Sequence, residues 1–153
     1  MKHMIKKYLY TIAMLSSLSH AIVCQQVHVG ISYGELIDKI TILTIKSERI
    51  TDPEKLHNII TELNSLRQLF NEYVGNRTDV IELMTELKII NETLWNIEDM
   101  IRIKENIKEF GNEFIQLARS VYITNDQRFI VKRKIDTILG SHIIEEKSYE
   151  NYA

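Results

Sequence analysis

Apolar residues between positions 56 and 101 recur at alternating spacings of three and four, the period of one face of an α-helix. The first stripe comprises Leu56, Ile59, Leu63, Leu66, Phe70 and Tyr73, and the second comprises Val80, Leu83, Leu87, Ile90, Leu94, Ile97 and Ile101. The chain has 153 residues with only 5 Gly and 1 Pro, too few turn residues for an all-β domain. The pattern therefore predicts one all-α domain.

Capping signals divide this domain into about five amphipathic helices. Ser32 is a good N-cap for the first helix, and Glu35 three residues later can return its hydrogen bond as a capping box. Asp52 before Pro53 starts the second helix. The second helix should end at Gly75-Asn76, and a break between helices is expected at Phe110-Gly111. A turn at Thr124-Asn125-Asp126 should supply the N-cap of the last helix, and Gly140 should end that helix. The two striped helices, joined by a short turn, should form a central antiparallel hairpin in a bundle-like fold. The last helix, over 126–139, should direct Ile130 or Val131, Ile135 and Ile138 inward.

The N-terminal segment has the three parts of a secretory signal. A basic start is followed by an apolar stretch over 8–18 and by Ser19-His20-Ala21, which suits a cleavage site. The alternatives are a membrane anchor over 8–23, a lipid-bearing Cys24, or a miscalled start on a cytoplasmic protein. The first reading gives an exported protein divided into a signal peptide (1–21), an extended arm (22–31), a helical domain (32–140) and a C-terminal tail (141–153).

Composition and motifs exclude several classes of function. The formal net charge is −2, which disfavours non-specific nucleic-acid binding. Scattered glycines build no phosphate-binding loop, and no Ser-His-Asp set is visible. Glu54 and His57 form the only Glu-x-x-His pair, whereas a di-metal bundle needs two such pairs and further carboxylates. The sequence predicts no cofactor and no metal.

A basic segment near the expected turn suggests a binding site. Arg128 and Lys132 lie four residues apart, and Arg119 precedes them in the neighbouring helix. Cations beside the N-terminal amides of a helix make an anion site. The alternative is a solvated helix face whose cations pair with nearby acids.

Longer stretches resemble a family of short bacterial and phage helical proteins of unknown function. The similar stretches, within residues 27–149, include the opening SYGELIDKITIL from Ser32, Asn91 to Asp99, ARSVYITNDQR from Ala118, and EEKSY from Glu145. The resemblance implies no established activity and a loose association with cell-surface polysaccharide biosynthesis. It also implies a start near Ser32, whereas about 24 residues precede the region of similarity here.

The polar character of the shared motifs favours a ligand or partner site. The candidate site residues are Glu35, Lys39, Glu98, Arg119, Asn125, Arg128 and Lys132. The leading hypothesis is a non-enzymatic binding or accessory module for an anionic small molecule, a glycan or a partner protein. The alternatives are a small enzyme with Glu35 or Glu98 as general base, and a structural homodimer joined through the two apolar stripes as in a coiled coil. A membrane partner is expected only with an uncleaved N-terminal segment.

Overall fold

The computed structural model describes residues 27–150, and the expected signal segment 1–21 and Cys24 lie outside this range. Four helices make up the described part: α2 (Tyr33–Arg49), α3 (Pro53–Tyr73), α4 (Thr78–Asn106) and α5 (Asn112–Leu139). No strand occurs between residues 27 and 150, so the all-α class is confirmed. None of these helices is long and apolar enough to cross a membrane.

Several helix ends lie where the capping signals placed them. The Ser32 hydroxyl accepts a hydrogen bond from the Glu35 amide at 3.1 Å, and Asp52 accepts one from the Lys55 amide at 2.9 Å. Gly140 ends α5 with a φ of 64°, a left-handed conformation that glycine adopts without steric cost. These ends are set by local chemistry, which is why the sequence predicts them.

The expected turn at residues 124–126 is wrong, because α5 runs through it without a break. Thr124 is buried, and Asn125 donates to the Val121 carbonyl at 3.1 Å as a residue inside a helix does. Polar residues that favour turns in isolation are here kept helical by packing of the flanking Val131 and Ile135 in the core. The predicted fourth and fifth helices are therefore one.

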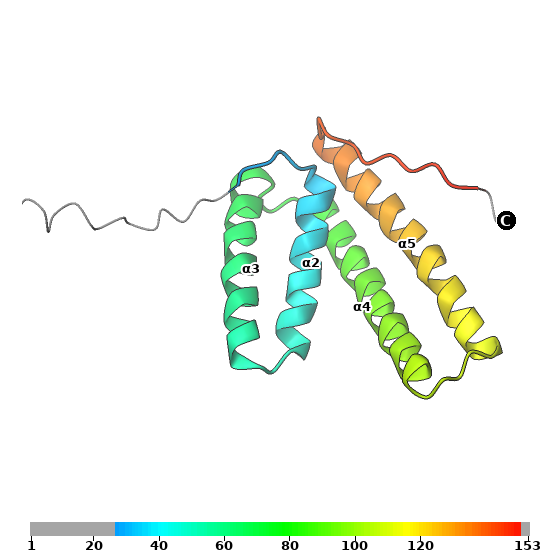
Figure 1. Ribbon diagram of the computed structural model, residues 1–153. Coiled ribbons are helices and arrows are strands. Elements are labelled where there is room, and N and C mark those ends of the chain that lie inside the picture. Colours follow the sequence, from blue (N-terminus) through cyan, green and yellow to red (C-terminus); the bar gives the residue numbers. More distant parts are fainter. Residues whose placement is uncertain (1–26, 151–153) are drawn as a thin grey trace, which may run out of the picture.

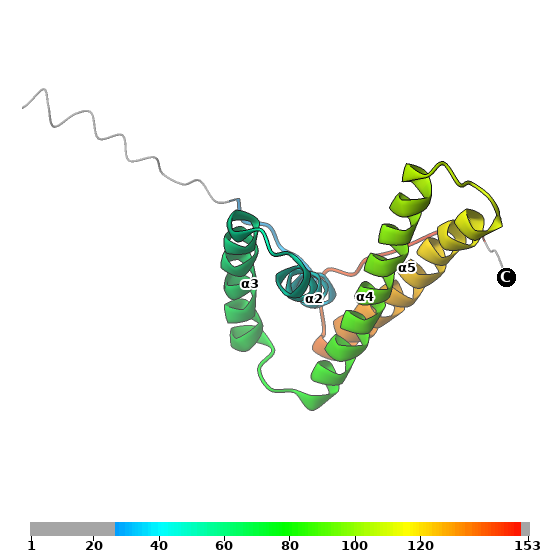
Figure 2. The same cartoon turned by 90° about the horizontal axis from the view of Figure 1, so that it is seen from below.

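The predicted central hairpin between residues 56–73 and 80–101 is also wrong. Among the described helices, α2 packs against α3, α4 and α5, while α4 pairs with α5 and α3 packs mainly on α2. Figure 2 shows α2 between α3 on one side and the α4–α5 pair on the other. Figure 1 shows the same two helical pairs, α2–α3 and α4–α5, side by side.

The central position of α2 follows from its apolar residues, which occupy more than one face. Leu36, Ile40 and Leu43 pack with Ile59 and Leu63 of α3. On its other side, Ile37 joins a cluster with residues of α4 and α5, comprising Val80, Leu87, Val131 and Ile135 as well as Val74 after α3. Residues of both predicted apolar stripes are thus buried within a single chain.

Candidate functional site

The start of α2 lies unusually close to the end of α5. The Gly34 amide donates to Asp136 Oδ1 at 2.6 Å, and the Tyr33 amide donates to Ser141 Oγ at 3.1 Å. A Cβ atom on Gly34 would lie 2.7 Å from the backbone oxygen of Lys132. The absence of a side chain at Gly34 is therefore what allows the two helices to approach.

One turn further along α2, the buried carboxylate of Asp38 joins three helices. Arg128 of α5 donates to it from both Nε, at 2.8 Å, and Nη2. Asn91 of α4 donates from Nδ2 to Asp38 Oδ1 and to Thr41 Oγ1, both at 2.9 Å. A buried charge is tolerated when it is paired and hydrogen-bonded in this way.

Lys132 lies one turn beyond Arg128 and binds two carboxylates. Its ammonium group donates to Glu35 of α2 and, at 2.6 Å, to Glu145 after α5. Burial lowers the pKa of Lys132, but the hydrogen bonds to Glu145 and Glu35 outweigh that effect and hold this pKa above its ordinary value of 10.5. The hydrogen bond to Asp38 likewise raises the pKa of Arg128 despite partial burial.

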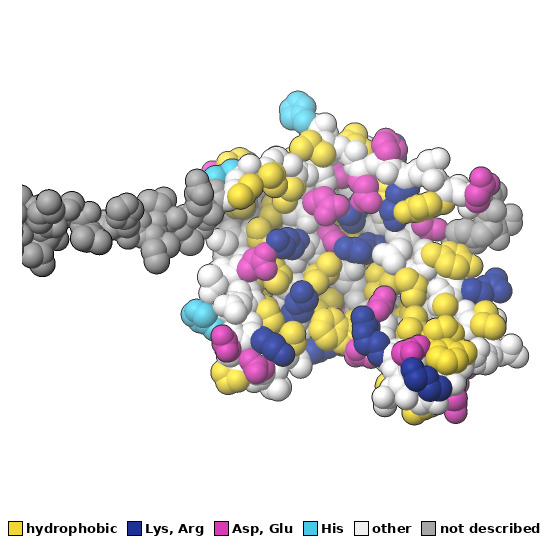
Figure 3. Space-filling view, viewed as in Figure 1, with side chains coloured by type: hydrophobic (Ala, Val, Ile, Leu, Met, Phe, Trp, Pro, Cys, Tyr) yellow, Lys and Arg dark blue, Asp and Glu magenta, His cyan; other side chains and the backbone are white. Residues whose placement is uncertain are grey.

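The segment after α5 runs back along that helix (Figure 1). Besides the Glu145 contact, Glu146 pairs with Arg133 at 2.7 Å. Lys147 lies 5.0 Å from the ring centre of Phe129. These contacts place three charged residues of the EEKSY motif against α5, and Figure 3 shows acidic and basic side chains beside one another on this face.

A groove of about 510 Å³ opens beside the Asp38 network, between α2, α4 and α5. This volume lies in the range of small-molecule sites. Its polar and aromatic lining residues are Asn91, Trp95, Glu98, Asp99, Arg102, Asn125 and Arg128. The Arg128 side chain is 28% exposed, so its guanidinium reaches both the buried carboxylate and the groove.

The structure brings together five of the seven candidate residues. Glu35 and Lys132 form an ion pair next to the Arg128–Asp38 pair. Asn125, with its Oδ1 3.4 Å from Arg128 Nη1, lines the groove together with Glu98.

Lys39 and Arg119 lie elsewhere. Lys39 pairs with Glu62 of α3 at 2.6 Å. Arg119 is exposed on α5 and precedes Arg128 by nine residues, which is two and a half helical turns and the opposite face. The helix N-terminus that would have gathered these cations around an anion does not form, because α5 is continuous.

Several residues of this region were missed in the sequence. Gly34 and the polar residue Asp38 stand in the opening motif but are not among the candidate site residues, and Asp136 follows Arg128 and Lys132 at the same four-residue spacing. Asn91 lies on the helical stripe of Met84 and Trp95, and a polar residue on an apolar stripe is the signal that could have revealed it.

Within residues 27–150, no cluster of three or more His, Cys, Asp or Glu side chains is arranged to hold a metal ion. The buried side-chain polar atoms of the described residues all have a hydrogen-bond partner. The network around Asp38 is therefore complete within the protein.

Replacing Lys132 with Met should remove a pH-dependent part of the stability. A lysine whose pKa is raised on folding stabilises the fold below the unfolded-state pKa, and this contribution is lost as pH rises through the folded-state pKa. The stability difference between wild type and Lys132→Met should thus be constant from pH 7 to 9 and shrink above pH 10.5. Urea unfolding across this pH range measures it; a difference that grows at high pH would contradict the assignment.

Comparison with known proteins places the chain in a family without a defined activity. No curated protein and no solved structure matches it. The model of a family described as a family of unknown function, DUF6165, matches residues 27–152. This match covers most of the chain, including the site and the segment after α5, and the protein therefore belongs to this family.

Proposed function

We propose that the protein is a non-enzymatic binding module that takes a glycan or another hydroxyl-rich ligand in the groove between α2, α4 and α5. The observation that carries this proposal is the mixed lining of the groove around Arg128, whose position is set by the buried Asp38. Two of the five N–H groups of Arg128 bind Asp38 and a third donates to Asn125 Oδ1 at 3.4 Å, which leaves two for a ligand.

The charges of the groove favour a neutral ligand over a small anion. Glu98 and Asp99 oppose Arg102 and Arg128 in its lining, and Asp38 already neutralises Arg128. Sugar hydroxyls both donate and accept hydrogen bonds, so they suit a lining of carboxylates, amides and guanidinium groups. The Trp95 ring adds an apolar aromatic surface that can pack against a ligand, and its indole N–H can donate a hydrogen bond.

An enzyme that uses Glu35 or Glu98 as general base has less support. Glu35 is bound by Lys132, and it is not among the residues that line the groove with Glu98. Glu98 itself pairs with Arg102 at 2.9 Å. A binding module also agrees with the association with cell-surface polysaccharides that the family resemblance implies.

The single tryptophan of the chain offers a direct test. Neutral and acidic oligosaccharides, with inorganic phosphate and sulfate as anion probes, would be titrated while the Trp95 fluorescence is recorded. We expect a saturable change with at least one oligosaccharide and none with phosphate or sulfate at 10-fold higher concentration. Tighter binding of phosphate than of any sugar, or no saturable change with any oligosaccharide, would contradict the proposal.

Variants then locate the site. Arg102→Ala removes an exposed side chain from the groove and should weaken oligosaccharide binding about tenfold, the effect of losing a hydrogen bond to a charged group. Arg67→Ala is the matched control, since Arg67 is exposed on α3 and does not line the groove. Equal affinities for both variants and wild type would place the ligand elsewhere.

A further inference from the structure

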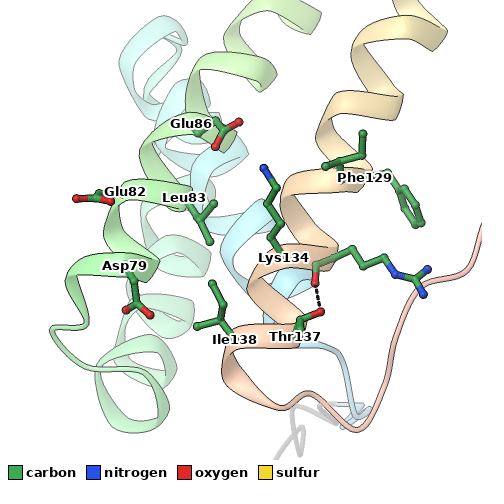
Figure 4. Close-up of a pocket in the computed structure, with 10 residues that line it drawn as sticks. Asp79, Glu82, Leu83, Glu86, Phe129, Lys134, Thr137 and Ile138 are labelled. Carbon is green, nitrogen blue, oxygen red and sulfur yellow. Dashed lines mark hydrogen bonds between the residues drawn. The ribbon is translucent and has the colours of Figure 1, made fainter.

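The α4–α5 pair has an outer face that no described helix covers. In Figure 4, α2 lies behind the pair, and Leu83, Lys134 and Ile138 of this outer face lie in the space between the two helices. A shallow groove of about 650 Å³ runs along it, with Leu83, Ile130 and Ile138 among its apolar lining residues.

Large apolar side chains continue this face beyond the groove. On α4, Ile89 is 58% exposed, and Met100 follows it after three helical turns; on α5, Ile123 precedes the 51% exposed Ile130 by seven residues, about two turns. The buried residues of α4 end at Asn91 and those of α5 begin at Thr124. The far half of the pair is thus a two-helix hairpin without a buried residue, and an apolar surface of this extent indicates an interaction site.

The charges on the two walls of the groove are opposite. Asp79, Glu82 and Glu86 line the α4 wall, while Arg133 and Lys134 line the α5 wall. Among the described residues, no hydrogen bond or ion pair engages the side chain of Glu82, Glu86 or Lys134. Figure 4 shows Glu82 and Glu86 on one helix and Lys134 on the other, with Leu83 and Ile138 between the two helices.

This pattern is complementary to itself under a twofold rotation. A twofold axis parallel to the hairpin, in the plane of the outer face, places α4 of each copy on α5 of the other and keeps every residue at its own level. The acidic wall of each copy then meets the basic wall of its partner, twice per dimer. Neighbouring helices are all antiparallel in this arrangement, as in an up-and-down four-helix bundle.

We propose that this outer face binds a second copy of the same chain, giving a twofold dimer whose interface is a four-helix bundle of two α4–α5 pairs. From residue 82 to 100 the face is about 27 Å long and two helices wide, about 20 Å, so roughly 1,100 Å² would be buried in total. That area falls just below the range of stable specific interfaces, in the size class of weak or transient complexes. The dimer should accordingly dissociate in the micromolar range.

The apolar stripes predicted to serve a homodimer are not the surface used here. Leu63, Val80 and Leu87 of those stripes are buried inside the single chain. Apart from Leu83, the outer face is formed by other residues of α4 and by α5. It also lies away from the groove around Arg128, so dimerisation and ligand binding are tested separately.

Sedimentation equilibrium of the full chain between 1 and 300 µM measures the self-association. Wild type should show a concentration-dependent monomer–dimer equilibrium. Lys134→Glu and the double variant Glu82→Lys/Glu86→Lys each place like charges across both contacts and should raise the dissociation constant at least tenfold. Ile130→Asp should do the same, whereas Ile60→Asp on α3, also an exposed apolar position, should not.

Two combinations of these charge reversals distinguish this geometry from other modes of self-association. The triple variant with all three reversals has exchanged walls and should recover wild-type affinity. An equimolar mixture of Lys134→Glu with Glu82→Lys/Glu86→Lys brings opposite charges together at both contacts, so it should form a heterodimer although each variant alone is weakened. A monomeric wild type at 300 µM, or a dimer that neither charge reversal weakens, would overturn the proposal.

Discussion

Arg128→Ala should destabilise the protein by about 3 kcal/mol, which is the range observed when one partner of a buried ion pair is removed. The substitution leaves the Asp38 carboxylate buried with only the Asn91 amide as a side-chain donor. We place the effect at the lower end of the range because 28% of the Arg128 side chain is exposed, so water can partly replace the guanidinium. Urea unfolding followed by circular dichroism measures this change.

Arg119→Ala is the matched control for this experiment. Arg119 lies on the same helix, is exposed, and forms no hydrogen bond or ion pair with another described residue, so its removal should change stability by less than about 0.5 kcal/mol. In a double-mutant cycle, Asp38→Ala and Arg128→Ala should be non-additive by about 1–3 kcal/mol. Additive effects would show that the pair contributes nothing as a pair.

Gly34→Ala should cost about 1–3 kcal/mol, the range for adding a methyl group to a close-packed site. The new Cβ atom would lie 2.7 Å from the Lys132 backbone oxygen and 3.0 Å from Asp136 Oδ2. A backbone atom cannot rotate away as a side chain can, so α2 and α5 must move apart. This movement would also lengthen the 2.6 Å hydrogen bond from the Gly34 amide to Asp136. Thermal unfolding measures the loss.

Gly111→Ala provides the comparison. Nothing lies within 4 Å of a Cβ atom at Gly111, and its φ of −74° is ordinary for any residue. This substitution should be neutral or stabilise the fold slightly, because alanine restricts the unfolded chain. Equal losses for both variants would mean that helix approach at Gly34 is not the cause.

The features that the sequence predicted depend on residues close together in the chain. Ser32 and Asp52 cap helices through amides three residues away, and Gly140 ends α5 by its own backbone conformation. The break before α5 likewise lies near Gly111, as expected. The family was also predicted correctly, because its motifs are continuous stretches of sequence.

The wrong predictions concern features that depend on contacts between distant parts of the chain. Thr124, Asn125 and Asp126 have turn propensity, yet Val131 and Ile135 pack in the core and keep this stretch helical. The same periodicity that predicted an inward Ile138 cannot measure how much of that face is covered, and this residue is 40% exposed.

In the candidate site, too, the sequence indicated the residues but not the tertiary contacts between them. The motifs indicated that Glu35, Arg128 and Lys132 matter, but their order in the sequence suggested an anion site at a helix start. In the folded chain, Glu35 and Lys132 are each other's partners, and Arg128 is held by Asp38, ninety residues away. Only folding brings these opposite charges together.

The sequence by itself determined the helical class, the caps and the polar motifs, because periodicity and capping act within a few residues. The tertiary structure decided that α2 lies at the centre, that α5 is one helix, and that the basic residues are paired with acids. It did so because apolar residues on more than one face of α2 can be buried only between two neighbours. That burial brings Gly34 and Asp38 against α5 and leaves the outer face of the α4–α5 pair uncovered.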